Sequence, residues 1–195
     1  MLRQSKRALF GAAAAVMLSV CPICSAQAET RSGSDAEYST LDPGEFIWRP
    51  EASPTGPVEV VVSLPLQVAY VYRGGALIGV STVSTGAPGH ETPTGSFRIL
   101  QKNRDHRSNL YNDAPMPFMQ RLTWDGIALH AGEIPGRPAS HGCVRLPLAF
   151  ARNLFAATRL GASVHIVDAA PSPEQAAAYL RSPARERTQL AGGDD

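Results

Sequence analysis

Cys143 and the two histidines that precede it, His130 and His141, are the residues of this chain best suited to chemistry. The thiolate, not the thiol, is the nucleophile, and a free cysteine has a pKa near ~8.5. A neighbouring imidazole can take the thiol proton and later return it, which typically contributes on the order of 10²–10⁴ in rate. The three residues therefore predict a cysteine nucleophile served by a histidine base.

Either histidine could be that base. His141 stands two residues before Cys143, and in an extended turn residues at this spacing direct their side chains to the same side. His130 ends an expected strand, which is a rigid position from which an imidazole can face the thiol across a loop. Because acid–base catalysis depends on a fixed geometry, we favour His130 and keep His141 as the alternative.

The residues around Cys143 suit an anionic intermediate. Gly142 has no side chain, so the backbone N–H groups of His141, Gly142 and Cys143 could converge on a developing oxyanion. Arg145 is suited to pairing with a substrate carboxylate. A zinc site built from His130, His141 and Cys143 is the main chemical rival, but no further cysteine or acidic residue is spaced as a ligand. We therefore expect no metal and no cofactor.

The first 28 residues have the pattern of a secretory signal. Basic residues precede an apolar run of 13 residues, and small residues follow at the positions that a signal peptidase reads, ending at Ala28. Retention as a membrane anchor and lipidation at Cys21 are the alternatives. Cleavage would remove Cys21 and Cys24 and leave Cys143 unpaired in an oxidising compartment, where such a thiol is either reactive or buried.

Composition indicates a globular, turn-rich chain. Of its 195 residues 44% are hydrophobic, and 17 Gly and 16 Pro favour short strands joined by turns. The chain has 18 basic and 17 acidic residues, and three of the basic ones lie in the signal. The remaining 15 against 17 give a charge of −2, which does not suggest nucleic acid as a partner.

Short strands account for most of the expected elements. Apolar and β-branched runs between turn residues predict strands at 58–63, 68–72, 76–83, 97–100, 118–122, 127–130 and 164–167. Residues 101–117 lack a period and are interpreted as a functional loop or lid. Tyr111, Met116 and the adjacent Phe118 could wall a cleft there, and the alternative is that they simply cover the core. Pro147 is placed to begin a helix that ends before Gly161, and a short helix is expected over 173–180.

Ser140 to Leu146, which reads Ser-His-Gly-Cys-Val-Arg-Leu, resembles the S-H-G-C-h-R/N signature of the L,D-transpeptidase (YkuD-type) catalytic domain. His130 matches the earlier histidine of that pattern, and Thr92-Pro93-Thr94-Gly95 matches its T-P-x-G turn. The resemblance implies a fold that is mainly β, a compact sandwich or barrel-like domain with one helix after the cysteine loop. It covers about residues 57–168.

The domain organisation expected from these observations has four parts. Residues 1–28 form the signal peptide and 29–56 a flexible linker, which docks at most through Phe46, Ile47 and Trp48. The catalytic domain spans 57–168. Residues 169–195 form a C-terminal tail.

The resemblance also implies a reaction on peptidoglycan stem peptides. Cys143 would attack the carbonyl at the L-centre of diaminopimelate, release D-Ala and pass the acyl group to an amine. His130 would carry the proton, while Ser140, His141 and Gly142 would shape the oxyanion site. Arg145 would bind or orient the stem peptide. Apart from the resemblance, Tyr111 and Phe118 are expected to bind substrate as walls of the cleft.

The implied location is the periplasm or cell envelope, without stable membrane insertion after cleavage. The expected partners are stem peptides and, as one acyl acceptor, an outer-membrane protein. Two alternatives remain: an L,D-carboxypeptidase or other hydrolase on the same scaffold, and a catalytically idle wall-binding module. His90, His106 and His165 are interpreted as surface or packing residues.

Overall fold

Short strands dominate the structure, as the turn-rich sequence predicts. The computed structural model describes residues 38, 40–108 and 113–181. In chain order the elements are β1 Phe46–Trp48, the 3₁₀ helix η1 Pro50–Ala52, β2 Val58–Ser63, β3 Val68–Arg73, β4 Ala76–Thr82, β5 Gly95–Arg98, β6 Gln101–Arg107, β7 Pro115–Arg121, β8 Ala128–Ala131, β9 Val144–Leu146, α2 Leu148–Ala157, β10 Ser163–Val167 and α3 Pro173–Arg181.

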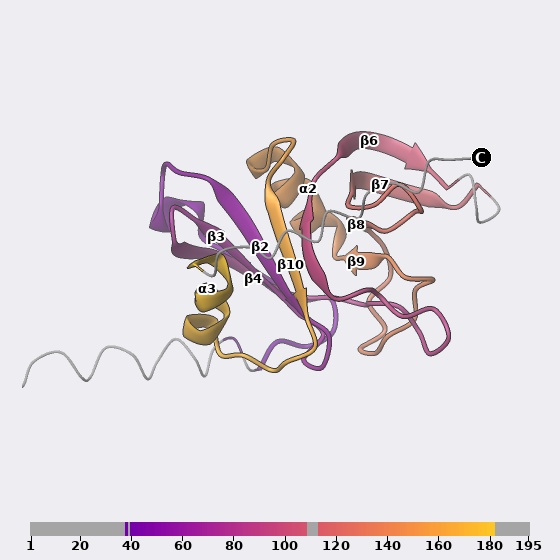
Figure 1. The fold of residues 1–195 in the computed structure, drawn as a ribbon, viewed down its shortest axis with the longest axis horizontal. Helices are drawn as coiled ribbons and strands as arrows, with labels where there is room; N and C mark the ends of the chain where they lie inside the picture. The colour runs from indigo at the N-terminus through magenta and orange to yellow at the C-terminus, as the bar shows by residue number, and fades with distance from the viewer. Residues whose placement is uncertain (1–37, 39, 109–112, 182–195) are drawn as a thin grey trace, which may run out of the picture. The chain divides into compact units, whose positions relative to one another are not determined.

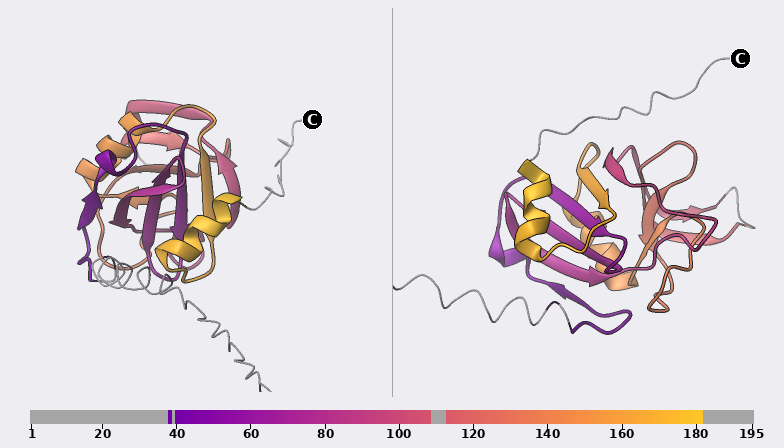
Figure 2. Two further views of the ribbon diagram at one scale, coloured as in Figure 1. Left: turned by 90° about the vertical axis from the view of Figure 1, so that its left-hand side faces the viewer. Right: turned by 60° about the horizontal axis from the view of Figure 1, so that its bottom comes forward.

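The first sheet has six strands in the order β1-β4-β3-β2-β10-β5 (Figure 1). Its strand pairs are antiparallel except β2 with β10. Val60 and Val62 of β2 face the main core, whereas Val61 faces a smaller core beneath α3. The left view of Figure 2 shows α3 running across this outer face. Because both faces are covered, β2 is apolar along nearly its whole length.

The second sheet, in the order β6-β7-β8-β9, shares its core with the first through helix α2. The helix packs against β7 and β8. Its Phe150 is fully buried, and the ring contacts those of Phe46 and Trp48 in β1 at centroid distances of 5.5 and 5.4 Å. The mainly β class is thus confirmed, with α2 following the cysteine loop directly after Pro147.

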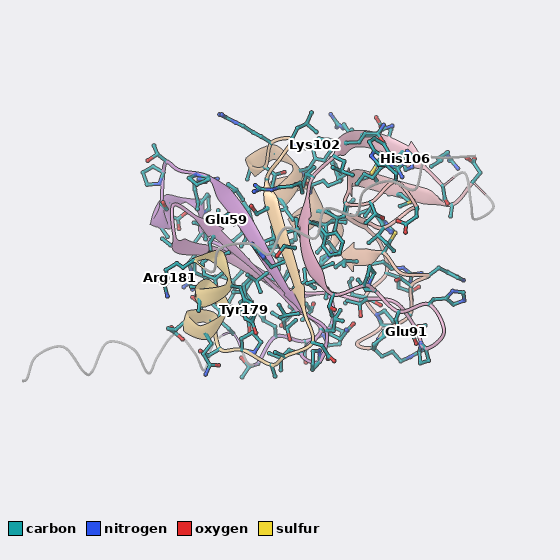
Figure 3. The ribbon with its side chains drawn as sticks, viewed as in Figure 1. Glu59, Glu91, Lys102, His106, Tyr179 and Arg181 are labelled. Atoms are coloured by element: carbon teal, nitrogen blue, oxygen red, sulfur yellow. The ribbon has the colours of Figure 1, made fainter. Side chains whose placement is uncertain are left out.

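The expected loop at 101–117 is wrong, because most of it forms strands. Strand β6 pairs with β7 as an antiparallel hairpin. Most β6 side chains are polar and exposed, so the strand shows no apolar alternation in the sequence. Lys102, labelled with His106 on β6 in Figure 3, donates from Nζ to the carbonyls of Phe155 and Thr158 at 2.6 and 2.8 Å. It thereby satisfies carbonyl groups at the end of α2.

Ordered structure extends beyond 57–168 at both ends. The expected linker contributes β1, which pairs antiparallel with β4, and the expected tail contributes α3. The hydroxyl of Tyr72 donates to the Pro173 carbonyl at 2.6 Å and fixes the start of α3 on β3. The signal, residues 1–28, lies outside the described residues. Among the described helices, none is both long and apolar enough to span a membrane.

Replacing Phe150 by alanine is expected to lower the free energy of unfolding by about 3–5 kcal/mol, because it leaves a cavity where α2 meets β1. Urea denaturation measures the change. Leu160→Ala, at a side chain that is 65% exposed, is the control and should stay within about 0.5 kcal/mol of the unchanged chain. A similar loss in both variants would contradict the assigned packing.

Candidate active site

The parallel pairing of β8 with β9 brings the candidate base and the candidate nucleophile together. His130 lies directly opposite Arg145 in this register. Cys143 immediately precedes β9 and is two residues from Arg145, so by strand alternation it belongs to the same face. Cys143, His130 and Arg145 all line one cavity of about 470 Å³. The structure therefore gathers three of the predicted site residues at one place.

The β6–β7 hairpin forms one wall of this cavity. Ser108, Ala114, Pro115 and Met116 line it from the distal end of the hairpin. An exposed ion pair between Arg107 and Asp113, 3.0 Å from Nη1 to Oδ2, joins the two arms there. The region that was interpreted as a lid is therefore a hairpin of two strands, and its distal end forms one wall of the cavity.

His130 is held in one tautomer. Its Nδ1 lies 2.8 Å from the carbonyl oxygen of Ala131, and a carbonyl can only accept, so Nδ1 carries the proton. Nε2 is then left as the basic nitrogen. The side chain is only 8% exposed, and this burial lowers the pKa of His130, with a further lowering by Arg145. The imidazole is therefore neutral near pH 7 and able to accept a proton.

The thiol of Cys143 is also neutral at rest. Sγ donates to the carbonyl of Gly126 at 3.3 Å. Burial raises the pKa of Cys143, while a hydrogen bond from the Ala128 backbone and the charges of Arg145 and Arg121 act in the opposite direction. Since the shifts move the thiol and the imidazole apart, the resting pair is thiol and imidazole, not thiolate and imidazolium.

The cysteine loop is held by Ser140. Its Oγ donates to the Cys143 carbonyl at 2.5 Å and accepts from the Gly142 N–H at 3.1 Å. The Gly142 N–H, which was expected to face an oxyanion, therefore already has a hydrogen-bond acceptor in the structure. Gly142 has φ +107°, and a Cβ there would lie 2.9 Å from Cδ1 of Ile127. The glycine is required by its backbone conformation and by the close approach of Ile127.

Thr92 of the Thr-Pro-Thr-Gly turn braces the same loop. Its buried hydroxyl donates to the Gly142 carbonyl at 2.8 Å and accepts from the Gly86 N–H at 2.8 Å. In the sequence this turn is recognisable only through its match to a family motif. A threonine hydroxyl that satisfies two backbone groups gives the pattern a structural reason.

Residues before the turn connect the first sheet to the site. Ser84 and Arg145 exchange backbone hydrogen bonds of 3.1 and 2.9 Å. The Thr85 carbonyl accepts from the N–H of Ser140 at 3.0 Å, and the Gln67 side chain binds both the N–H and the hydroxyl of Thr85. The cysteine loop is therefore fixed to the first sheet through backbone groups.

His141, the alternative base, is not buried as His130 is. It is exposed at the cavity, and its ring lies against that of His90 with centroids 4.7 Å apart. His90 was expected to be a surface or packing residue; it is exposed, yet it contacts a cavity-lining side chain. Gly86, four residues before His90, is the sequence signal for a close approach, because a Cβ there would clash with the His90 carbonyl oxygen.

Phe118, one of the two aromatic residues expected at the cleft, is not among the residues that line the cavity. Phe118 packs its ring against Phe155 of α2 at a centroid distance of 5.8 Å and lies against the main core. It has φ +57°, which is uncommon for a residue with a side chain. Tyr111 lies outside the described residues. Substrate binding by Phe118 therefore finds no support in its position.

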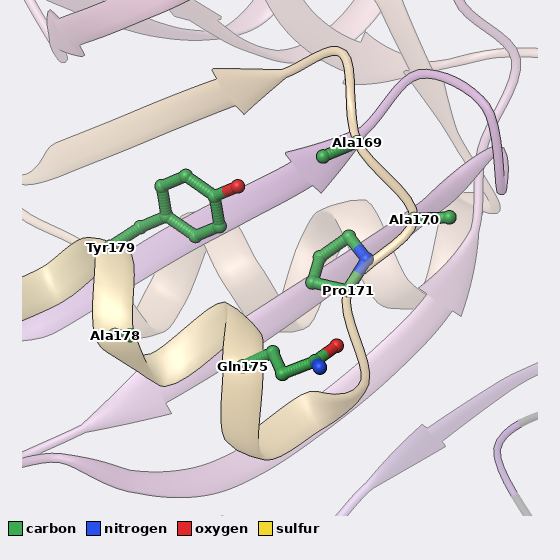
Figure 4. A pocket seen from close by; sticks show the side chains of 6 residues that line it. All are labelled: Ala169, Ala170, Pro171, Gln175, Ala178 and Tyr179. Atoms are coloured by element: carbon green, nitrogen blue, oxygen red, sulfur yellow. The ribbon is translucent and has the colours of Figure 1, made fainter.

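A zinc site finds no ligand set in the described part of the chain. No three His, Cys, Asp or Glu side chains converge there as metal ligands. A second cavity, of about 320 Å³, lies beside α3 and is lined by Ala169, Pro171 and Tyr179 among others (Figure 4). Its lining holds no histidine or cysteine, whereas the lining of the first cavity holds both.

Comparison with known proteins decides the family. The model of the YkuD family, the L,D-transpeptidase catalytic domain, matches residues 57–166, more than half of the chain. The chain belongs to this family. The fold is similar to an L,D-transpeptidase from Mycobacterium tuberculosis H37Rv, with 25% identity and a TM-score of 0.55 over 58% of this chain and 59% of that one.

A second solved structure, the L,D-transpeptidase from Stackebrandtia nassauensis, is 28% identical with a TM-score of 0.54. The match covers 59% of this chain and 57% of that one. The chain thus spans less than two thirds of either structure. The search of curated proteins found no match.

Replacing Thr92 by valine is expected to lower the free energy of unfolding by about 1–3 kcal/mol, because two backbone groups lose their partner in a buried position. Chemical denaturation measures the change. Thr92→Ser keeps the hydroxyl and should stay close to the unchanged chain. Equal stability of the valine and serine variants would contradict the bracing role.

Replacing Arg145 by glutamine is expected to raise the pKa of Cys143, because the guanidinium stabilises the thiolate. Since only the thiolate reacts with iodoacetamide, the pH of half-maximal alkylation should rise. Mass spectrometry of the Cys143 peptide separates this thiol from the other two cysteines. Arg152→Gln, on the exposed side of α2, is the matched control. An alkylation profile that is the same in all three proteins would contradict the assigned electrostatic effect.

Proposed function

We propose that this protein is an exported cysteine L,D-transpeptidase acting on peptidoglycan stem peptides. The observation that carries the proposal is the shared cavity of Cys143, His130 and Arg145, with the imidazole oriented by the Ala131 carbonyl. Membership of the YkuD family supports the reaction class. A thiol, a base and a cation in one cavity are what acyl transfer from a carboxylate-bearing peptide requires.

The first step is acylation. Nε2 of His130 takes the Cys143 proton as Sγ bonds to the carbonyl carbon at the L-centre of diaminopimelate. The C–N bond to D-Ala then breaks, and the imidazolium returns the proton to the departing amine. A neutral thiol and a neutral imidazole form a competent pair for this step, because proton transfer accompanies attack.

The second step passes the acyl group to an amine. The acceptor nitrogen bonds to the acyl carbon and gives its proton to His130, and the C–S bond breaks as Sγ regains a proton. A second stem peptide as acceptor gives a 3–3 cross-link, and an outer-membrane protein would become attached to the wall. Water as acceptor would make the protein a carboxypeptidase, so exclusion of water from the cavity decides between the two outcomes.

The other loop residues support these steps. The Gly142 N–H is engaged by Ser140, so we assign oxyanion stabilisation to the backbone N–H of Cys143, which lies at the end of the braced loop. Ser140 and His141 shape this loop. Arg145 holds the stem peptide by a carboxylate.

The proposed location is the periplasm or cell envelope, after cleavage of residues 1–28. The apolar run and the small residues before position 29 support this. Stem peptides are the proposed partners. The reaction as proposed uses no cofactor, because the thiol and the imidazole supply both the nucleophile and the proton transfer.

Cys143→Ala is expected to abolish D-Ala release from a disaccharide-tetrapeptide, and His130→Gln to lower it by on the order of 10²–10⁴, because each removes one half of the acid–base pair. Mass spectrometry of the products distinguishes a cross-linked dimer, a tripeptide or no change. A dimer supports transpeptidation, a tripeptide supports hydrolysis, and no change supports an idle binding module. Turnover by Cys143→Ala at the unchanged rate would reject the mechanism.

A further inference from the structure

Two opposite charges line the candidate cavity, one on each side of Gly132. Glu133 directly follows Gly132 in the chain, and Arg145 lies alongside Gly132 from the neighbouring strand. They are the only acidic and basic side chains, histidines aside, among the described residues that line the cavity. A cavity with one fixed cation and one fixed anion suits a ligand that carries both charges.

The two side chains do not neutralise each other. Within the described part of the chain, no nitrogen of Arg145 lies within 4.0 Å of a carboxylate oxygen of Glu133. The Gly132 N–H donates to the Leu146 carbonyl at 2.9 Å and prolongs the β8–β9 pairing between the two residues. A ligand can therefore meet both charges without first breaking an ion pair.

Gly132 sets the course of the arginine side chain. A Cβ at this position would lie 3.0 Å from both Cγ and Cδ of Arg145. The aliphatic part of Arg145 therefore lies flat against the Gly132 backbone, beside the residue that bears the carboxylate. An arginine fixed in this way loses little side-chain freedom when it binds a carboxylate.

We infer that Glu133 is a specificity-determining residue, which together with Arg145 binds the distal, zwitterionic end of the donor diaminopimelate side chain. This inference rests on the proposed function. When the L-centre is acylated onto Cys143, the D-centre of the same residue remains free and carries an ammonium and a carboxylate on one carbon. Arg145 pairs with that carboxylate and Glu133 with that ammonium. A lysine at the same position offers only the ammonium.

The reacting amine is a poorer partner for Glu133. An attacking amine must be unprotonated, and a carboxylate beside it would favour the protonated ammonium instead. The D-centre ammonium of the donor takes no part in the bond changes and can stay charged throughout. The charge of Glu133 therefore suits donor selection better than activation of the acceptor.

The test measures acylation of the full-length protein by three disaccharide-tetrapeptides. Their third residues are meso-diaminopimelate, the same residue acetylated on its D-centre nitrogen, and lysine. The covalent adduct on Cys143 and the released D-Ala are followed by mass spectrometry at several donor concentrations, without an added acceptor. Glu133→Gln removes the charge at nearly constant size. Glu51→Gln, at an exposed carboxylate in η1, is the matched control.

The unchanged protein should prefer the diaminopimelate donor over both others. Glu133→Gln should lower the second-order acylation rate roughly tenfold for that donor, as expected for one charged hydrogen bond, and leave the acetylated donor nearly unaffected. Glu51→Gln should behave as the unchanged protein with all three. An equal loss on the acetylated donor, or no loss on any donor, would overturn the role of Glu133. Absence of acylation by the unchanged protein with every donor would instead overturn the proposed function.

Discussion

The parallel pairing of β8 with β9 is the constraint on which the candidate site depends. Parallel neighbours cannot be joined by a tight turn, so the chain must leave β8 after Ala131 and return through a long loop before Val144. That return brings Cys143 to the start of β9, beside the strand that carries His130. The register then puts Arg145 opposite His130. A shift of one residue would turn the thiol or the imidazole to the core face.

Most residues of the returning loop, 132–143, are exposed or half-buried. Hydrogen bonds to its backbone groups hold the loop in place. Thr85, Thr92 and Ser140 each bind backbone groups of the cysteine loop or of the segment beside it. Hydrogen bonds of this kind are directional, so they fix position more narrowly than apolar contacts do. This explains why Thr85, Thr92 and Ser140, which have short polar side chains, are buried next to the cysteine loop.

The sequence predicted the strands with apolar runs and the residues with distinctive chemistry, and missed features that depend on distant partners. Strand β6 was read as a loop because its side chains are polar and its pairing is made by the backbone. The role of Thr92 could not be read from spacing, since its partner Gly142 is 50 residues away. Phe118 was expected at the cleft, but it packs against Phe155 and the main core. The residue type alone does not show whether an aromatic side chain faces the core or the cavity.

The charges and burial in the cavity bear on whether the Cys143 thiol is ionised or neutral at rest. In one, a nearby cation or imidazolium keeps the thiol ionised at rest. Here burial raises the pKa of Cys143 and lowers that of His130, so the charged pair is disfavoured in the absence of a ligand. A neutral thiol is a weak nucleophile toward adventitious electrophiles, and in the proposed mechanism it becomes reactive when its proton moves to Nε2 of His130. Arg145 limits the rise in the pKa of Cys143, so the same cation that we assign to substrate binding also eases formation of the thiolate.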